Sequence, residues 1–186
     1  MKKLLVINGS PNKHGHTTKI LDDIMIGVDK DIEINYVNCY SLDIKPCIDC
    51  KNCSNIQGIC SIEDSMTMIY KHIKESNIII LASPMYFGMF PAPLKSLIDR
   101  CQVIWSEKFI FNNINKENKK GIFIFNGGSS WDNMFINMEN IGKYLFNTLD
   151  CSIIYKILID NTDKKLEHLE INKDKILKCR SLINNS

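Results

Sequence analysis

The sequence has no long apolar run. None of its hydrophobic stretches approaches the ~20 residues that a helix needs to cross a bilayer. The apolar run near the N-terminus covers residues 4–7 before Asn8-Gly9 ends it, which is too short for the hydrophobic region of a secretory signal. We therefore expect a cytoplasmic protein with no membrane partner.

The sequence also has little net charge. Its 23 Lys and Arg residues and 21 Asp and Glu residues leave a net charge of +2 with the four His neutral, which gives no support to nucleic acid as a partner. No internal repeat or low-complexity linker divides the 186 residues. With 45% hydrophobic residues, a chain of this length can bury a substantial core. We expect a single domain over residues 1–186.

Strand-like and helix-like segments alternate along the chain. Residues 78–81, all Ile or Leu, are typical of a strand buried on both faces, and residues 17–28 carry apolar side chains at helical spacing. Five strands that alternate with helices predict an α/β fold with a doubly wound parallel sheet. The strands are expected at residues 3–8, 32–38, 77–82, 121–125 and 152–159, and the helices at 17–28, 64–75, 91–104, 131–149 and 163–183.

Ligands of such sheets bind at the carboxyl ends of the strands, so we expect functional residues just after strands one, three and four. The segment after strand one, 9–18, has neither the P-loop pattern of nucleoside triphosphatases nor the glycine pattern of dinucleotide sites. The hydroxyls of Ser10, Thr17 and Thr18 nevertheless lie at the expected start of a helix, where free N–H groups and the helix dipole favour a phosphate. The alternative is that Ser10 begins a turn and Thr17 only caps the helix.

Three segments carry a family resemblance. They are 9–18 with Gly9-Ser10-Pro11 and His16-Thr17-Thr18, then 83–88, then 94–100 with Asp99-Arg100. Together they resemble the NAD(P)H-dependent FMN reductases and, within them, the iron–sulfur flavoproteins, over roughly residues 1–130. The resemblance implies a flavodoxin-like sheet with strand order 2-1-3-4-5, FMN as the cofactor and two-electron flavin chemistry. It places Ser10, His16, Thr17 and Thr18 at the FMN phosphate, with His16 where the family commonly has Asn. Pro11 and Asn12, in the same loop, are further expected cofactor contacts.

The segments after strands three and four are the expected flavin loops. Bulky side chains at 85–87 can form an apolar wall for the isoalloxazine ring, while Pro84 fixes the entry angle and Gly88 allows close approach. The alternative for this segment is a buried turn whose aromatic side chains belong to the core. The residues after strand four can border the ring or form an ordinary loop. The expected contacts are Pro84, Met85, Tyr86, Phe87, Gly88, Asn126, Gly127 and Gly128.

Four of the eight cysteines lie within fourteen positions, in a cysteine-rich loop at 44–63 with the spacing C-x2-C-x2-C-x6-C. Ligation by four thiolates is what a [4Fe-4S] cluster needs, and Lys45 and Lys51 can offset part of the cluster's negative charge. Zinc, or no metal at all, are the alternatives, although structural zinc sites usually separate two ligand pairs by a longer stretch. The proposed ligands are Cys47, Cys50, Cys53 and Cys60, whereas Cys39, Cys101, Cys151 and Cys179 are expected in the core.

These features predict an FMN-dependent oxidoreductase that passes electrons from NAD(P)H or a ferredoxin-like carrier to a small-molecule or protein acceptor. No side chain need act as acid or base, because the flavin carries the chemistry. The alternatives are a cluster-free FMN or quinone reductase that uses NAD(P)H, and a non-catalytic carrier like flavodoxin, which a charge of +2 disfavours because flavodoxins are strongly acidic.

Two further expectations concern assembly and the helix at 91–104. The family resemblance implies a homodimer or homotetramer. A flat flavin at a strand end also needs a cover, and closed symmetric assemblies are the default for soluble oligomers. Trp131, Trp105 and Phe90 are candidate covers. Asp99 and Arg100 are interpreted as a salt-bridge pair.

Overall fold

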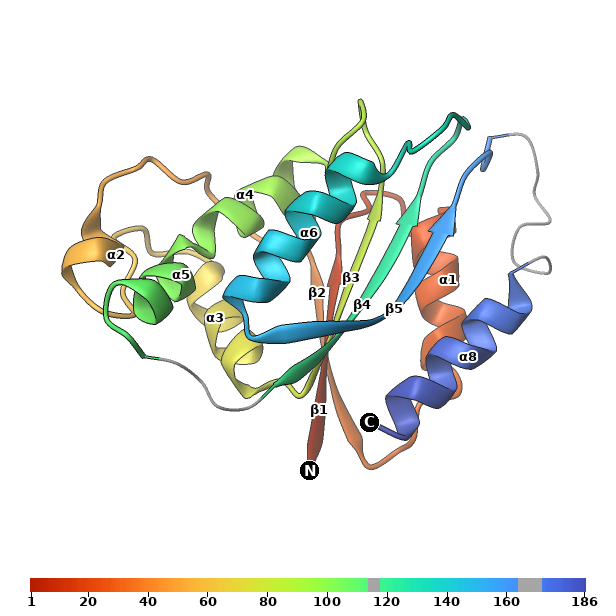
Figure 1. Cartoon of the computed structure of the whole chain (residues 1–186), viewed down its shortest axis with the longest axis horizontal. Coiled ribbons are helices and arrows are strands. Elements are labelled where there is room, and N and C mark those ends of the chain that lie inside the picture. The colour runs from red at the N-terminus through yellow and green to blue at the C-terminus, as the bar shows by residue number, and fades with distance from the viewer. Residues whose placement is uncertain (114–117, 164–171) are drawn as a thin grey trace.

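The computed structural model describes residues 1–113, 118–163 and 172–186. Its centre is a five-stranded parallel sheet with the strand order β2-β1-β3-β4-β5, and helices cover both faces of the sheet (Figure 1). The predicted fold class and strand order are therefore confirmed. The strands are β1 (Lys2–Asn8), β2 (Ile32–Asn38), β3 (Ile78–Pro84), β4 (Lys119–Asn126) and β5 (Cys151–Ile159).

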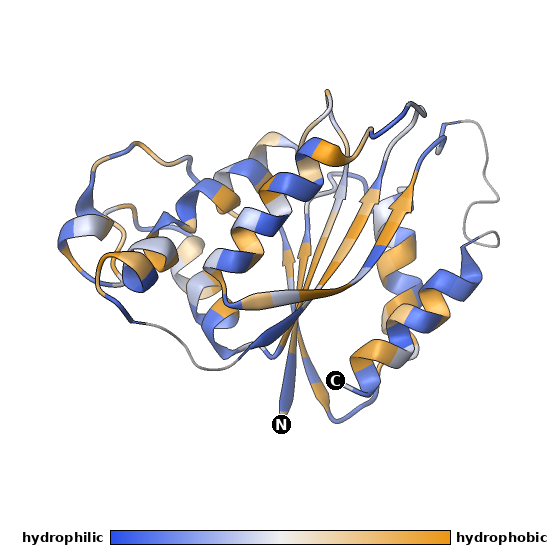
Figure 2. Cartoon of the chain, in the orientation of Figure 1, coloured by the Kyte–Doolittle hydropathy of each residue, from blue (hydrophilic) through white to orange (hydrophobic). Residues whose placement is uncertain are grey.

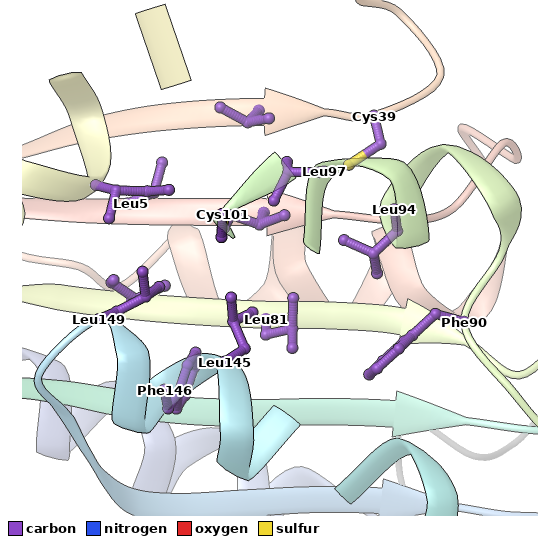
Figure 3. Close-up of a cluster of buried hydrophobic side chains, with 14 of the residues drawn as sticks. Leu5, Cys39, Leu81, Phe90, Leu94, Leu97, Cys101, Leu145, Phe146 and Leu149 are labelled. Atoms are coloured by element: carbon purple, nitrogen blue, oxygen red, sulfur yellow. The ribbon is translucent and has the colours of Figure 1, made fainter. Parts of the chain in front are cut away.

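Alternation along the strands divides the core into two clusters, one on each face of the sheet. Leu5 and Ile7 of β1 point to one face, and Leu4 and Val6 point to the other. All four side chains are fully buried, which explains why the strand is an unbroken apolar run in the sequence. Figure 2 shows the apolar strands enclosed between helices whose outer sides are hydrophilic, and Figure 3 shows the first cluster.

Of the helices in the described residues, two pack on one face of the sheet and the others lie on the opposite side. Buried side chains of α1 and α8 join the cluster of Leu4 and Val6, whereas those of α3, α4 and α6 join the cluster of Leu5 and Ile7. The short helix α2 lies next to α5, at the far end of the helical layer that contains α3, α4 and α6 (Figure 1). The helices are α1 (His16–Met25), α2 (Asn52–Asn55), α3 (Met66–Glu75), α4 (Ala92–Arg100), α5 (Gln102–Phe109), α6 (Ile136–Thr148) and α8 (Lys173–Asn184).

Three predicted helices differ from the structure. The helix expected at 91–104 is two helices, α4 and α5, separated at Cys101, where a ψ of −1° leaves the α-helical range. The helix expected at 131–149 begins only at Ile136, because Asn133 has a φ of 58°, a left-handed conformation that an α-helix cannot contain. Of the helix expected at 163–183, residues 173–183 are helical and 164–171 lie outside the described residues.

The described helices include none with the length and apolar character needed to cross a membrane. All eight cysteines are free thiols. The four that were expected in the core, Cys39, Cys101, Cys151 and Cys179, are buried, as predicted.

Candidate functional site

Three loops meet at the carboxyl edge of the sheet, after the neighbouring strands β1, β3 and β4. Asn126, the last residue of β4, joins them. Its buried side-chain Oδ1 accepts a 2.5 Å hydrogen bond from the Thr17 hydroxyl, and its backbone oxygen accepts a 2.7 Å bond from the Met85 amide. The structure thus brings together residues from all three segments that were predicted to bind the cofactor.

The loop after β1 is held in shape by its own asparagines. Asn8 is fully buried, its Oδ1 accepts the Ser10 amide at 2.8 Å, and its Nδ2 donates to the Tyr36 hydroxyl at 2.8 Å. The backbone oxygen of Asn12 accepts the Thr18 hydroxyl at 2.9 Å. Sequence analysis missed Asn8, whose only signal is a polar residue at the end of an apolar strand. These bonds fix the conformation of the loop.

The N-terminus of α1 has no side-chain cap. The N-cap residue is Gly15, with no side-chain hydrogen bond, and the first turn carries no acidic residue. The interpretation of Thr17 as an N-cap is therefore wrong, since Thr17 is the second helical residue and its hydroxyl bonds to Asn126. Ser10 does begin a turn, because its Oγ accepts the Asn12 amide at 3.2 Å. An uncapped first turn has backbone N–H groups without an intrahelical acceptor and suits a phosphate group.

The loop after β3 is a tight turn that exposes aromatic side chains. The backbones of Tyr86 and Met89 bond to each other in both directions, at 2.9 and 3.1 Å, and enclose Phe87 and Gly88 with φ of 53° and 77°. Positive φ at both central residues is the two-residue hairpin geometry. Phe87 is fully exposed and Tyr86 is 47% exposed, so the alternative of a buried aromatic turn is wrong.

The loop after β4 packs against the rest of the chain. A Cβ on Gly127 would lie 2.5 Å from Cε of Met134, and one on Gly128 would lie 2.1 Å from Oδ2 of Asp163. The Gly127 oxygen also accepts the Thr162 amide at 3.1 Å. A side chain at either position would have to displace the end of the Met134 or Asp163 side chain. The predicted contact of both glycines with the flavin stays a prediction.

The candidate covers of the flavin differ in exposure. Phe90 is buried and packs edge-on against Phe125, with 5.4 Å between ring centroids, and it lies among the core side chains in Figure 3. Phe90 is therefore a core residue, and its interpretation as a cover is wrong. Trp131 and Trp105 are partly exposed.

The cysteine-rich loop surrounds a small cavity. Cys47, Cys50, Cys53 and Cys60 all line a cavity of about 60 Å³ beside α5. Among the described residues, no three His, Cys, Asp or Glu side chains are grouped closely enough to hold a single metal ion. Four thiols around one cavity equal the number of protein ligands that a [4Fe-4S] cluster needs.

The backbone of this loop is also suited to an anionic group. Asp49 and Lys51, on either side of Cys50, have φ of 53° and 62°, a left-handed conformation that is uncommon outside glycine. Backbone that alternates in this way forms concavities of N–H groups that are typical of phosphate and iron–sulfur sites. The donor set and the backbone therefore fit a thiolate-bound cluster.

An ion pair closes the base of the cysteine-rich loop. The buried guanidinium of Arg100 binds both carboxylate oxygens of Asp64, at 2.8 and 3.2 Å. Burial alone would raise the pKa of Asp64, but the hydrogen bonds from Arg100 and from the Lys45 and Met66 amides hold it below its usual value. The interpretation of Asp99 and Arg100 as a pair is wrong, because Asp99 instead pairs with Lys95 on the exposed side of α4, at 2.7 Å.

The profile of the NADPH-dependent FMN reductase family matches residues 2–132, about two thirds of the chain. The chain belongs to this family. The matched region contains strands β1–β4, the three loops that Asn126 joins and the cysteine-rich loop.

Within the FMN reductase family, the sequence is similar to iron–sulfur flavoproteins. It is 37% identical to one from Methanocaldococcus jannaschii over 99 residues, which are 53% of this chain and 51% of that protein. It is 32% identical to one from Methanosarcina thermophila over 128 residues, which are 68% of this chain and 64% of that protein. The chain therefore spans about half to two thirds of the length of these relatives.

Solved structures share the fold of the whole chain. The NAD(P)H:quinone oxidoreductase from Methanothermobacter marburgensis has a TM-score of 0.71 at 10% identity, with 99% of this chain and 96% of that chain covered. An FMN-dependent NADH-azoreductase from Bacillus anthracis, solved in complex with FMN, has a TM-score of 0.66 at 16% identity and covers 99% of this chain and 100% of that one. At these identities the comparison establishes the flavodoxin-like fold.

In the cysteine-rich loop of this FMN reductase family member, hydrogen bonds lower the pKa of one thiol, that of Cys50. Cys50 Sγ lies 3.0 Å from the Ser61 hydroxyl, and this bond and the Asn52 amide lower the pKa of the Cys50 thiol. Burial raises the pKa of the core thiols to about 12. Because the thiolate is the reactive form, alkylation of the metal-free chain is expected at Cys50 and not in the core.

Replacing Ser61 with alanine is expected to slow the alkylation of Cys50 several-fold at neutral pH, because the pKa of the thiol returns toward its ordinary value when the bond to Ser61 is lost. The rate is measured with iodoacetamide on the metal-free chain and assigned by peptide mapping. Ser54→Ala, in the same loop, is the control and should leave the rate unchanged. An unchanged rate in Ser61→Ala would show that this hydrogen bond does not activate Cys50.

Proposed function

We propose that this protein is an FMN-dependent oxidoreductase of the NAD(P)H-dependent reductase type, with the flavin on the three loops joined by Asn126 and a [4Fe-4S] cluster on the cysteine-rich loop. The single observation that carries the proposal is the double attachment of Asn126, to Thr17 on one side and Met85 on the other. It makes one site from three segments that are far apart in the sequence.

The residues of this site match the parts of FMN. The backbone amides in the first turn of α1 would bind the phosphate, with the Thr18 hydroxyl beside them. Met85 and Tyr86 would pack against the isoalloxazine ring, and the turn at Phe87 and Gly88 would bring backbone N–H and C=O groups to its polar edge. The flavin, when bound, supplies the chemistry of accepting two electrons and passing them on.

The cysteine-rich loop would hold the second cofactor. Four thiolates around one cavity satisfy the ligand count of a [4Fe-4S] cluster, and the names of the iron–sulfur flavoprotein relatives support the same cofactor. Such a cluster supplies one-electron transfer beside the two-electron chemistry of the flavin. The cluster-free reductase is the competing function, and iron and sulfide analysis of anaerobically purified protein separates the two.

Release of the flavin tests the central claim. Denaturation of the anaerobically purified holoprotein, followed by chromatography, is expected to give FMN at about one per chain. Recovery of FAD, or no flavin uptake after reconstitution, would contradict the proposal. Steady-state oxidation of NADH or NADPH then distinguishes an enzyme from a passive carrier, which would bind FMN but show no turnover. Location in the cytoplasm stays a prediction.

We also propose a homodimer or homotetramer whose interface covers the flavin edge. The fully exposed Phe87, in the turn after β3, and the exposed Trp131 support this proposal, because large exposed apolar side chains favour contact with a partner. Light scattering of the FMN-bound protein at micromolar concentration should give a mass of two or four chains. A monomer with FMN bound would contradict this proposal.

A further inference from the structure

The cavity lined by the four cysteines has a buried cation in its wall. Arg100, the last residue of α4, lines this cavity and is only 1% exposed. Its guanidinium forms hydrogen bonds with both ends of the cysteine-rich loop. Its Nη1 donates to the Lys45 oxygen at 2.9 Å, and its Nη2 donates to the Ile62 oxygen at 3.1 Å.

These bonds determine the shape of the loop. Lys45 lies just before the first cysteine and Ile62 just after the fourth, so one guanidinium holds the two ends of the loop together. The carboxylate of Asp64 strengthens the junction, since it binds the same guanidinium and also accepts the Lys45 amide at 2.9 Å. A planar group with five N–H donors can make all of these bonds at once, and a lysine ammonium cannot.

One donor of this guanidinium has no acceptor. The Nε atom of Arg100 is buried and makes no hydrogen bond within the described part of the chain. A buried donor without a partner is unfavourable and rare. Arg100 lines a cavity together with the four cysteines and with polar residues that include Asp49, Ser54 and Gln102. A thiolate-bound cluster in this cavity would bring sulfur atoms that accept hydrogen bonds.

The guanidinium of Arg100 is a permanent charge. The carboxylate of Asp64 stabilises this charge through two hydrogen bonds, at 2.8 and 3.2 Å. The guanidinium therefore stays charged beside the cysteines. The lysines that were expected to offset the cluster's charge are less suited to that role, because Lys45 and Lys51 are exposed and lie 3.8 and 2.5 Å from Asp43 and Asp49.

We propose that Arg100 is a positioning residue for the iron–sulfur cluster: it closes the base of the cysteine-rich loop and offers its unpaired Nε–H to a sulfur atom of the bound cluster. This inference rests on the proposed function, because it requires the cysteine-rich loop to hold a cluster. Arg100 would then have two measurable effects on the cluster. The closed loop base slows the loss of the cluster, and the buried positive charge with its hydrogen bond raises the cluster's reduction potential.

The test compares the natural chain with Arg100→Lys and Arg100→Met after anaerobic reconstitution with iron and sulfide. The readouts are the iron retained against a chelator, the reduction potential from an EPR-monitored titration, and FMN affinity. Both variants should bind FMN within about twofold of the natural chain, because Arg100 lies outside the three loops that Asn126 joins. Cluster affinity should fall about 10- to 100-fold, as is typical when a residue that supports metal ligands is lost. The potential should become more negative, and more so in Arg100→Met, which also loses the charge.

The control is Asp99→Asn, the neighbouring residue on α4, whose ion pair with Lys95 is exposed. It should change none of the three readouts. If the natural chain binds FMN but takes up no iron, both the inference and the cluster in the proposed function are wrong. If it takes up iron and neither Arg100 variant changes retention or potential, the inference alone is wrong. If Arg100→Met does not fold, Arg100→Lys decides by the same readouts, and loss of FMN and iron together in Arg100→Lys would make Arg100 a general folding residue and overturn the inference.

Discussion

A glutamate in place of Thr18 is expected to weaken FMN binding at least about 100-fold. Thr18 is in the first turn of α1, where the uncapped backbone amides are proposed to bind the phosphate. A carboxylate there would face the phosphate with like charge, which costs several kcal/mol, and each 1.4 kcal/mol is tenfold in affinity. The helix itself should form normally, because an acidic residue in the first turn is favourable with respect to the helix dipole.

Lys19→Glu is the matched control for this prediction. Lys19 is the next residue of the same helix and is exposed, and its replacement changes the net charge by two units instead of one. If only the overall charge matters, Lys19→Glu should weaken binding more than Thr18→Glu. We expect the opposite order, measured by fluorescence titration of the apoprotein with FMN. Equal affinities for Thr18→Glu and the natural chain would remove the first turn of α1 from the phosphate site.

Replacing Cys50 with alanine is expected to abolish stable cluster assembly. Cys50 lies between the left-handed residues Asp49 and Lys51 and lines the cavity with the other three cysteines of the loop. Three remaining thiolates leave one iron of the cluster without a protein ligand. After anaerobic reconstitution, the natural chain should hold about four irons and the variant close to none.

Cys179→Ala is the control for this experiment. Cys179 is buried in α8, in the core cluster on the face of the sheet opposite α3 and α4. This variant should keep the full iron content, because it removes a thiol that does not line the cavity. Equal iron content in Cys50→Ala and the natural chain would show that the cysteine-rich loop is not the cluster site and would favour a cluster-free FMN reductase.

The sheet could be predicted from the sequence because buried parallel strands are continuous apolar runs, such as residues 78–81. The boundaries of the helices could not be predicted in this way. Apolar spacing continues through Cys101 and through residues 131–135, so the pattern predicts uninterrupted helices. The breaks depend on single backbone angles, the ψ of Cys101 and the positive φ of Asn133, and neither angle alters the spacing of apolar residues.

The position of the candidate site could be predicted from the order of the strands, but the hydrogen bonds between its side chains could not. Loops after adjacent parallel strands must meet at one edge of the sheet, so the three loops are readable from the order of the elements. Which side chains bind each other is a different question. Thr17 and Asn126 are 109 residues apart and Asp64 and Arg100 are 36 apart, and no local pattern indicates such partners. Asp99, next in sequence to Arg100, is the partner that proximity along the chain suggests.

The helix α4 begins four residues after Gly88, which is in the turn after β3 (Figure 1). It ends at Arg100, in the wall of the cysteine-lined cavity. At 1.5 Å per residue, its nine residues form a helix about 13 Å long. The distance between the two ends is therefore set by a rigid element and not by either loop. One residue inserted into this helix would rotate Arg100 by about 100° around the helix axis and lengthen the helix by about 1.5 Å. The length of α4 therefore determines the separation of the two proposed cofactor sites, whatever the number of residues in the two loops.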